Sequence, residues 1–326
     1  METHVSSRLW GLTRPPARPS TGKSSVFAPD DIRALVAKAE AGYWGPLARA
    51  VTIVENSPPW DVTVPLSESR AHIVGVTGPP GAGKSTLTGR LIESCVDAGQ
   101  RVAVVAIDPS SPLTGGAVLG DRLRMEAHLD GRPGVFVRSL ASRGSHGAVA
   151  GATRNIARLL ELSGLFDVIV IETVGAGQTE IAIVEVADTV VLVTVPGLGD
   201  AVQTIKAGLM EVADMFVVNM ADRPGAAETA RHLRLAAGKA SNVLQTTATE
   251  GIGIDALREA LDTRWASLAD GDVLDELRLQ KWGSDAALIA EAWVAATAKE
   301  LPRDTTETMK QAVDGILREA SRRWNA

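Results

Sequence analysis

Eight consecutive residues, Gly78-Pro79-Pro80-Gly81-Ala82-Gly83-Lys84-Ser85, form a complete G-x-x-x-x-G-K-[ST] loop. The β-branched run 72–77 before it predicts a strand, and apolar residues at four-residue spacing from Thr86 onward predict a helix. Such a strand, loop and helix surround a phosphate with backbone N–H groups and a positive helix end. Lys84 is expected to reach the β- and γ-phosphates. The alternative is a glycine-rich turn that binds nothing, but the flanking elements favour a nucleoside triphosphate site, with Thr86 completing it.

Two carboxylates follow apolar runs and are predicted to hold Mg²⁺ together with the Ser85 hydroxyl. Asp108 follows the run 101–107, and Glu172 ends the run that starts at residue 167. A carboxylate that leaves a strand beside a phosphate loop is placed to bind the ion or its waters. An Asp-Pro turn is the alternative for Asp108, whereas an uncompensated Glu172 at the end of an apolar strand would be costly.

Further candidates for chemistry at the γ-phosphate lie in two polar loops. In loop 114–122, Asp121 is placed to orient the attacking water and Arg122 to offset phosphate charge, unless both are solvated charges at a helix start. In the second loop, the N–H of Gly175 is expected to approach the γ-phosphate, and Gln178 is a candidate for positioning water. The predicted catalytic residues are thus Lys84, Asp121 and Glu172.

The segment Asn219-Met220-Ala221-Asp222 resembles the N-K-x-D motif with which GTPases read guanine. An ionised Asp222 matches the two donors of guanine and repels the N1 acceptor of adenine. Met220 stands where the motif has lysine, and its thioether is still able to cover the base face. Thr247-Ala248-Thr249 is expected to form a second base-contacting loop, with the Ala248 amide near the guanine oxygen.

The order of apolar runs predicts a three-layer α/β fold, a P-loop NTPase domain with a mostly parallel sheet. Several of the runs are continuously apolar, as in strands that are buried on both faces. Ligands of such sheets lie beyond the carboxyl ends of the strands, where all the motifs above fall. The predicted strands are 72–77, 101–107, 135–138, 167–171, 188–195, 214–219 and 242–247.

The segments outside this domain are predicted to be a disordered tail (1–29), an N-terminal helical cap (30–70) and a C-terminal helical extension (263–326), which leaves 71–262 for the P-loop domain. The extension contains helix candidates at 272–300, with Gly283 as a candidate break, and at 304–323. It also holds Trp265, Trp282, Trp293 and Trp324. Large aromatics there indicate either intramolecular packing or a dimer interface.

Composition narrows the functional classes. The net charge of −6 argues against a nucleic-acid binder held by bulk electrostatics. No apolar run has the length of a membrane span, and no secretory signal is visible, so a cytoplasmic protein is expected. Cys95 is the single cysteine, which excludes an internal disulfide, and its place on the apolar helix face predicts a core residue.

The combined motifs resemble the MeaB/ArgK-type G proteins, GTPase chaperones of methylmalonyl-CoA mutase. The matching segments cover about residues 30–260 in order: 48–55, 75–86, 103–125, 167–180, 195–214 and 219–222. The resemblance implies a SIMIBI-class GTPase that binds GTP, GDP and Mg²⁺, forms a homodimer and assists or protects an adenosylcobalamin-dependent mutase. It also implies that Gly197 to Lys206 is a mobile signalling loop with Gln203 and Lys206 as effectors, although Lys206 as a solvated helix charge stays an alternative. The C-terminal extension is a candidate dimerisation arm.

Two other functions compete with a GTPase chaperone. A kinase acting on a small molecule or a protein would need an acceptor pocket with a base near the γ-phosphate, and no separate substrate motif is visible. A nickel-insertion metallochaperone would need a Cys/His cluster, which the scattered histidines and single cysteine do not form.

Overall fold

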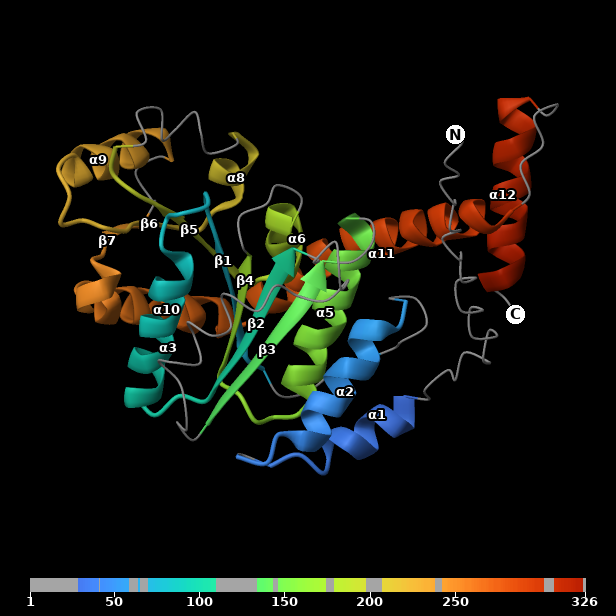
Figure 1. Ribbon diagram of the computed structural model, residues 1–326, viewed down its shortest axis with the longest axis horizontal. Coiled ribbons are helices and arrows are strands. Elements are labelled where there is room, and N and C mark those ends of the chain that lie inside the picture. Colours follow the sequence, from blue (N-terminus) through green and yellow to red (C-terminus); the bar gives the residue numbers. More distant parts are fainter. Residues whose placement is uncertain are drawn as a thin grey trace, which may run out of the picture.

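The computed structural model describes residues 29–40, 42–58, 64, 70–109, 134–142, 146–173, 179–197, 207–237, 242–301 and 308–324. Their centre is a seven-stranded sheet in the order β3-β2-β4-β1-β5-β6-β7, with every neighbouring pair parallel (Figure 1). The strands are β1 (His72–Thr77), β2 (Val102–Pro109), β3 (Val135–Ser142), β4 (Val168–Thr173), β5 (Thr189–Thr194), β6 (Met215–Val218) and β7 (Asn242–Gln245).

The central strands β1, β4 and β5 are buried at every position. The sequence predicted that these strands are apolar because both faces of a parallel sheet are buried, and the structure confirms this. All seven predicted strands are present, and the predicted three-layer P-loop NTPase fold is confirmed.

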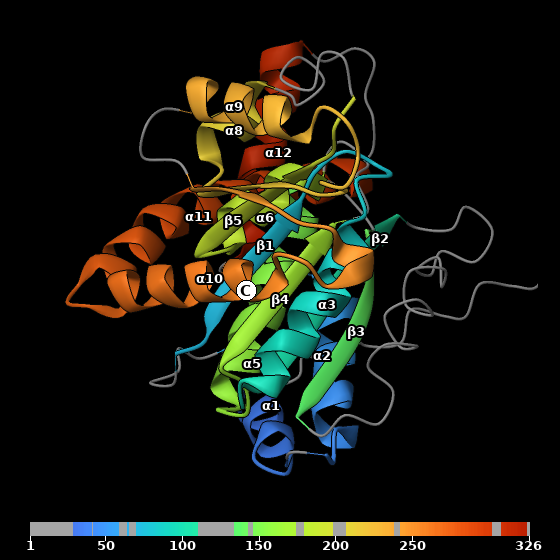
Figure 2. The same ribbon diagram turned by 90° about the vertical axis from the view of Figure 1, so that its left-hand side faces the viewer.

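Helices cover both faces of the sheet (Figure 2). On one face, α3 and α10 pack on alternate strand residues such as Val74, Val104 and Val170, and the buried thiol of Cys95 belongs to this cluster. Burial raises the pKa of Cys95 to about 12, so it is a core residue as predicted. The other face carries α5, α6, α8 and α9. These helices are α3 (Lys84–Asp97), α5 (His146–Leu162), α6 (Thr179–Val186), α8 (Ala207–Val212), α9 (Ala226–Ala236) and α10 (Ile254–Ala269), with a short 3-10 helix η1 (Ala248–Glu250) before α10.

The N-terminal helix α2 (Gly45–Asn56) packs on α5, and α1 (Pro29–Val36) packs on α2; both helices share the hydrophobic core of α5. Trp44 stacks on Phe166 with ring centroids 5.4 Å apart and meets Phe136 edge-on at 5.9 Å. Aromatic contacts of this kind add to the stabilisation from buried area. The two helices are thus joined to the sheet by one continuous core.

The C-terminal helices are α11 (Val273–Glu300) and α12 (Met309–Trp324). α11 is one uninterrupted helix, so the predicted break at Gly283 is wrong. A mid-helix glycine destabilises by only about 1 kcal/mol, and the turns on either side keep their hydrogen bonds. α11 packs on α5 and α6 at one end and carries α12 away from the sheet at the other (Figure 1). The predicted domain boundary after residue 262 falls inside α10.

Two of the four tryptophans in the extension make contacts within the chain. Trp265 stacks on His72 with ring centroids 5.0 Å apart, and the Trp293 indole donates a 3.0 Å hydrogen bond to the Ala320 carbonyl. The side chains of Trp265 and Trp293 therefore pack within the chain. The side chains of Trp282 and Trp324 lie outside the description. In the described part of the chain, no helix is both long and apolar enough to cross a membrane.

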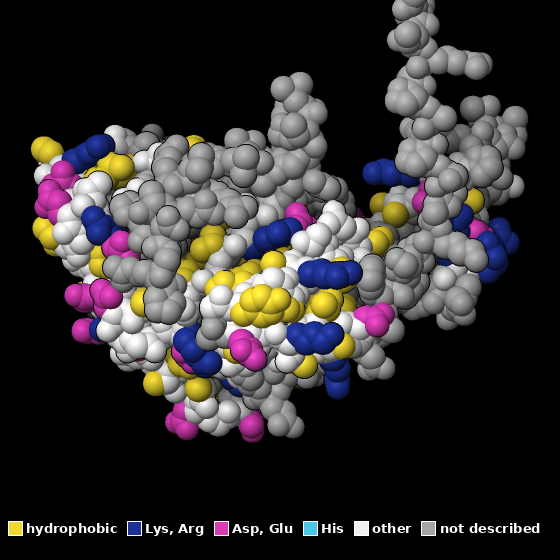
Figure 3. Space-filling view, turned by 60° about the horizontal axis from the view of Figure 1, so that its bottom comes forward, with side chains coloured by type: hydrophobic (Ala, Val, Ile, Leu, Met, Phe, Trp, Pro, Cys, Tyr) yellow, Lys and Arg dark blue, Asp and Glu magenta, His cyan; other side chains and the backbone are white. Residues whose placement is uncertain are grey.

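The surface carries charges of both signs. On the face drawn in Figure 3, the Lys and Arg side chains of the described residues are interspersed with hydrophobic and acidic ones. This mixture agrees with the net charge of −6.

Candidate nucleotide site

The glycine loop connects β1 to α3 and is shaped by close backbone approaches. Gly78 has φ +144°, and a Cβ placed there would lie 2.1 Å from the Val193 carbonyl oxygen. Gly83 has φ +78°, and its Cβ would lie 2.5 Å from Asn219 Nδ2. No other residue type fits these two positions without a shift of the neighbouring strand ends. The loop is therefore fixed between β5 and the residues that follow β6.

The Lys84 side chain is turned into this loop. Its ammonium group donates hydrogen bonds of 2.8 Å to the Gly78 carbonyl and 3.0 Å to the Pro79 carbonyl. The residue is only 6% exposed. A positive charge is thus held within the curve of the loop, together with the N-terminal end of α3, and both favour an anion.

Two of the predicted Mg²⁺ ligands lie next to each other. The Ser85 hydroxyl donates a 2.6 Å hydrogen bond to Glu172 Oε1, and Glu172 is 1% exposed. The sheet explains this placement, because Glu172 in β4 is in register with Val76 in β1, just before the loop. Two hard oxygen donors at this spacing fit Mg²⁺.

Asp108 lies at the same edge of the sheet. It is the second-last residue of β2. The residue before it, Ile107, is in register with Thr173 of the neighbouring strand β4. The backbone position of Asp108 agrees with the prediction, while its side chain lies outside the description. Asp121, Arg122, Gly175, Gln178, Gln203 and Lys206 also lie outside the described residues.

The segment after β6 braces the glycine loop. Asn219 Nδ2 donates a 2.9 Å hydrogen bond to the Ala82 carbonyl, and Oδ1 accepts bonds of 3.1 Å from the Thr246 hydroxyl and from the Ala248 amide. Asn219 thus connects the phosphate loop with the second candidate base loop. The Ala248 amide has a single hydrogen, and it donates this hydrogen to Asn219 Oδ1. In this structure the hydrogen is therefore not available for the predicted bond to a base oxygen.

In this segment, Met220 packs against the glycine loop, whereas Asp222 faces solvent. Met220 has φ +55°, a left-handed conformation that is uncommon for residues other than glycine, and packs beside Gly83. Its methyl group lies 3.7 Å from where a Gly83 Cβ would be. Asp222 is exposed in the turn that follows. The segment therefore offers an apolar surface and a solvent-facing carboxylate next to the glycine loop.

The second loop adds two threonines and a contact with α3. Thr247 is buried, while Thr249 is exposed and its carbonyl accepts a 3.2 Å hydrogen bond from Arg90. Sequence reasoning missed Thr246 and Arg90 as supports of this site. No motif spacing marks either residue, because each contacts a segment that is distant in the sequence.

The site thus lies beyond the carboxyl ends of β1, β4 and β6, with β1 between β4 and β5. Because the chain leaves β1 toward β2 on one side and returns through β4 to β5 on the other, this is the switch point where open α/β sheets bind ligands. The fold and the loop define a P-loop nucleoside triphosphatase. Residues 47–301 match the family described as Methylmalonyl Co-A mutase-associated GTPase MeaB. The chain belongs to this family and is a GTPase that binds guanine nucleotides.

Individual relatives agree with this placement. A Pyrococcus horikoshii protein named as a GTPase is 47% identical over 259 residues, which are 75% of this chain and 81% of the relative. The GTPase ArgK of Escherichia coli is 36% identical over 256 residues, 72% and 76% of the two chains. A crystal structure of an LAO/AO transport system kinase covers 91% of this chain and 93% of its own with a TM-score of 0.53 and 24% identity, a likeness of fold.

Proposed function

We propose that this GTPase is a chaperone that assists or protects an adenosylcobalamin-dependent acyl-CoA mutase of the methylmalonyl-CoA type. The observation that carries the proposal is family membership over residues 47–301, because the family description names association with that mutase. GTP hydrolysis then serves assembly of a partner enzyme, and the chain itself modifies no metabolite.

We assign the phosphate chemistry to Lys84, Ser85 and Glu172. Lys84 would bind the β- and γ-phosphates, and Ser85 with Glu172 would hold Mg²⁺, as the 2.6 Å contact between them supports. The ion would offset the negative charge that develops on the phosphates during transfer. Asp108 is the proposed third metal ligand, Asp121 the proposed residue for orienting water and Gly175 the proposed sensor of the γ-phosphate.

We assign base recognition to Asp222, supported by Met220, Thr247 and Thr249. In the variant Asp222→Asn, preference should turn from GTP toward XTP, because the amide is able to donate to the extra oxygen of xanthine. Competition binding with a fluorescent GDP measures this directly. The exposed Asp270 just after α10 supplies the control, since Asp270→Asn should leave preference unchanged. Equal competition by ATP and GTP in the wild-type protein would contradict the assignment.

Hydrolysis is expected to be slow alone and faster with the mutase. Positioning and charge stabilisation dominate phosphoryl transfer, and an arginine supplied by a partner contributes a factor of roughly 10³ to 10⁵ in known cases. The experiment measures steady-state GTP turnover with and without the mutase of the same cell. Stimulation should be lost in a Gln203→Ala/Lys206→Ala variant and retained in Arg231→Ala on exposed α9. An unchanged wild-type rate would count against the chaperone proposal.

A kinase remains the second candidate, because the similar crystal structure is that of a protein named as a transport system kinase. The two functions differ in where the γ-phosphate goes. Labelled GTP incubated with the protein and cell extract should release its label as inorganic phosphate for a chaperone GTPase. Label transferred to a small molecule or a protein would favour the kinase.

We also propose a homodimer formed through α11 and α12. An apolar hollow of about 400 Å³ lies between these helices. Val313 and Leu317 line it and are nearly half exposed, while Met309 nearby is 81% exposed. Apolar side chains gathered on a helix that projects from the sheet support a self-complementary interface.

A further inference from the structure

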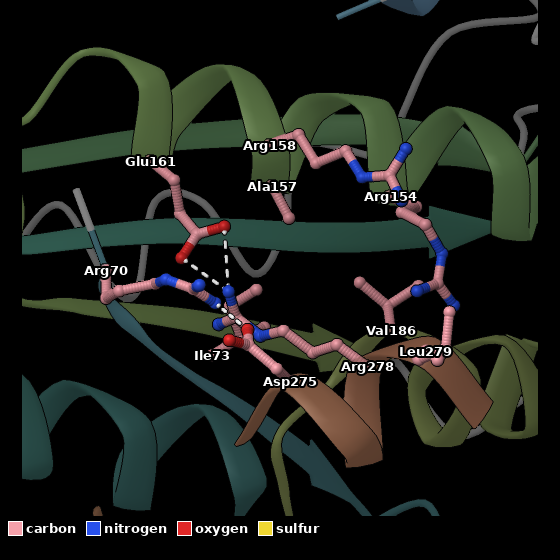
Figure 4. Close-up of a pocket in the computed structure, with 10 residues that line it drawn as sticks. All are labelled: Arg70, Ile73, Arg154, Ala157, Arg158, Glu161, Val186, Asp275, Arg278 and Leu279. Carbon is pink, nitrogen blue, oxygen red and sulfur yellow. Dashed lines mark hydrogen bonds and ion pairs between the residues drawn. The ribbon is translucent and has the colours of Figure 1, made fainter. Parts of the chain in front are cut away.

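A second cavity, of about 240 Å³, lies at the opposite end of β1 from the glycine loop (Figure 4). It is enclosed by the start of β1, one side of α5 and the first turns of α11. About five strand residues, or roughly 17 Å, separate it from the loop. Its lining combines four arginines and two carboxylates with an apolar surface: Arg70, Arg154, Arg158, Arg278, Glu161, Asp275, Ile73, Ala157, Val186 and Leu279.

Two of the four arginines are neutralised by ion pairs. Arg278 contacts Glu161 at 3.1 Å and the buried Asp188 at 2.6 Å. Arg70 contacts Asp275 at 2.7 Å at the cavity rim. Figure 4 shows Glu161 turned toward Arg278. These carboxylates are therefore engaged by Arg278 and Arg70.

Arg154 and Arg158 are one helical turn apart on α5 and both line the cavity. Burial and then the neighbouring Arg158 lower the pKa of Arg154 to about 10, against smaller opposing effects of Glu185 and Asp188. Burial also lowers the pKa of Arg158, which Glu161 raises and Arg278 lowers. Like charges at this spacing destabilise a helix, and a desolvated cation needs a compensating anion.

The contacts of the two side chains differ. Arg154 donates a hydrogen bond to the Glu185 carbonyl. For Arg158, no hydrogen bond or ion pair is found with the described residues, although its guanidinium has five N–H donors. Figure 4 shows both side chains leaving the same helix, with Arg158 directed toward Arg154. An oxyanion beside Arg158 would supply acceptors and a negative charge for its guanidinium, and Arg154 lies one helical turn away on the same side of the cavity.

We propose that this cavity binds a small organic anion through a phosphate or carboxylate group held by Arg158 and Arg154. The planar guanidinium fork matches both groups in a bidentate manner. The volume equals that of about eight water molecules, which suits one such group with a short apolar body. Ile73, Val186 and Leu279 are placed to contact that body. This site is separate from the nucleotide loop and does not depend on the chaperone role.

The test uses inorganic phosphate and malonate as probes. Wild-type protein is first saturated with GDP and Mg²⁺, so that the glycine loop is occupied, and each probe is titrated by calorimetry at constant ionic strength. One equivalent of at least one probe should bind. Phosphate alone, malonate alone or both would identify the group that the site accepts. Absence of binding by both would overturn the proposal.

Matched variants locate the binding. Arg158→Gln should weaken the affinity for the bound probe about tenfold or more, in line with loss of a charged hydrogen bond. Arg231→Gln makes the same change of charge on exposed α9 and should bind as wild type does. Wild-type GTP turnover by Arg158→Gln would show that it is folded. If it does not fold, Arg158→Lys keeps the charge without the fork and should still bind more weakly. Equal affinity in a folded Arg158 variant would exclude the site.

Discussion

Replacing Lys84 with alanine is expected to abolish GTP hydrolysis. The ammonium group is the buried positive charge within the glycine loop, where it now contacts the Gly78 and Pro79 carbonyls. In the transition state, charge on the transferred phosphate would gather at that place. Loss of one such prepared contact typically costs about 3 kcal/mol or more, or roughly a hundredfold in rate or greater.

Single-turnover hydrolysis and binding of a fluorescent GTP analogue measure the two parts of this effect. Both should fall, because the γ-phosphate loses its contact in the bound state and in the transition state. Lys299→Ala, on the exposed end of α11, removes the same charge and should change neither quantity. The thermal midpoint of Lys84→Ala should stay near that of wild type. Hydrolysis within a few-fold of wild type would remove Lys84 from the catalytic site.

The variant Arg278→Met is expected to destabilise the whole domain by about 3–5 kcal/mol. Arg278 neutralises Glu161 and Asp188, which are both buried, and donates a 3.2 Å hydrogen bond to the Ala71 carbonyl. Burial raises the pKa of Glu161, and the charge of Arg278 opposes that rise. Without the arginine, two buried carboxylates would lose the cation that compensates their charge.

Urea unfolding followed by circular dichroism measures this loss. The pair of Arg322 and Glu319 on α12 provides the control, because Arg322 is exposed to solvent and Arg322→Met should leave the urea midpoint near that of wild type. Adding Glu161→Gln to Arg278→Met should recover part of the loss, since one uncompensated charge is removed. A single variant Arg278→Met with wild-type stability would show that the carboxylates are compensated in another way.

The strands and the phosphate loop could be predicted from the sequence because each depends on local pattern. The run 73–76 carries no polar side chain, and the loop after it has glycines at 78 and 83, where the backbone approaches its neighbours closely. The meeting of Ser85 with Glu172 also follows, since both lie at carboxyl ends of strands. The adjacency of β1 and β4, which brings them together, could not be known from spacing.

Other features depend on contacts between distant segments and had no local signal. Asn219 belongs to the predicted base motif, and the sequence did not indicate that its amide group would also brace Ala82 and Ala248. Gly283 has the residue type of a helix break, yet α11 continues through it. The boundary predicted after residue 262 follows the end of the strand pattern, and it falls inside α10, which contacts Ser94 of α3 through Arg258.

The network around Arg278 illustrates the same limit. Its partners precede it by 90 residues at Asp188 and by 117 at Glu161. Arginine and glutamate on helices are common surface residues, so neither type nor spacing distinguishes this pair from solvated charges. Only the packing of α11 on α5 makes them internal.

That separation along the chain has a consequence for synthesis. A ribosome that adds about 5 to 20 residues per second needs roughly 5 to 20 s to proceed from Asp188 to Arg278, which lie 90 residues apart. During that interval β5, β6 and β7 are added to the four earlier strands, but the chain still lacks the cation that two of its internal carboxylates require. The amino edge of the sheet therefore stays open until α11 is made, and translation pauses or nonsense codons before residue 273 would leave a chain that needs a holding chaperone of its own.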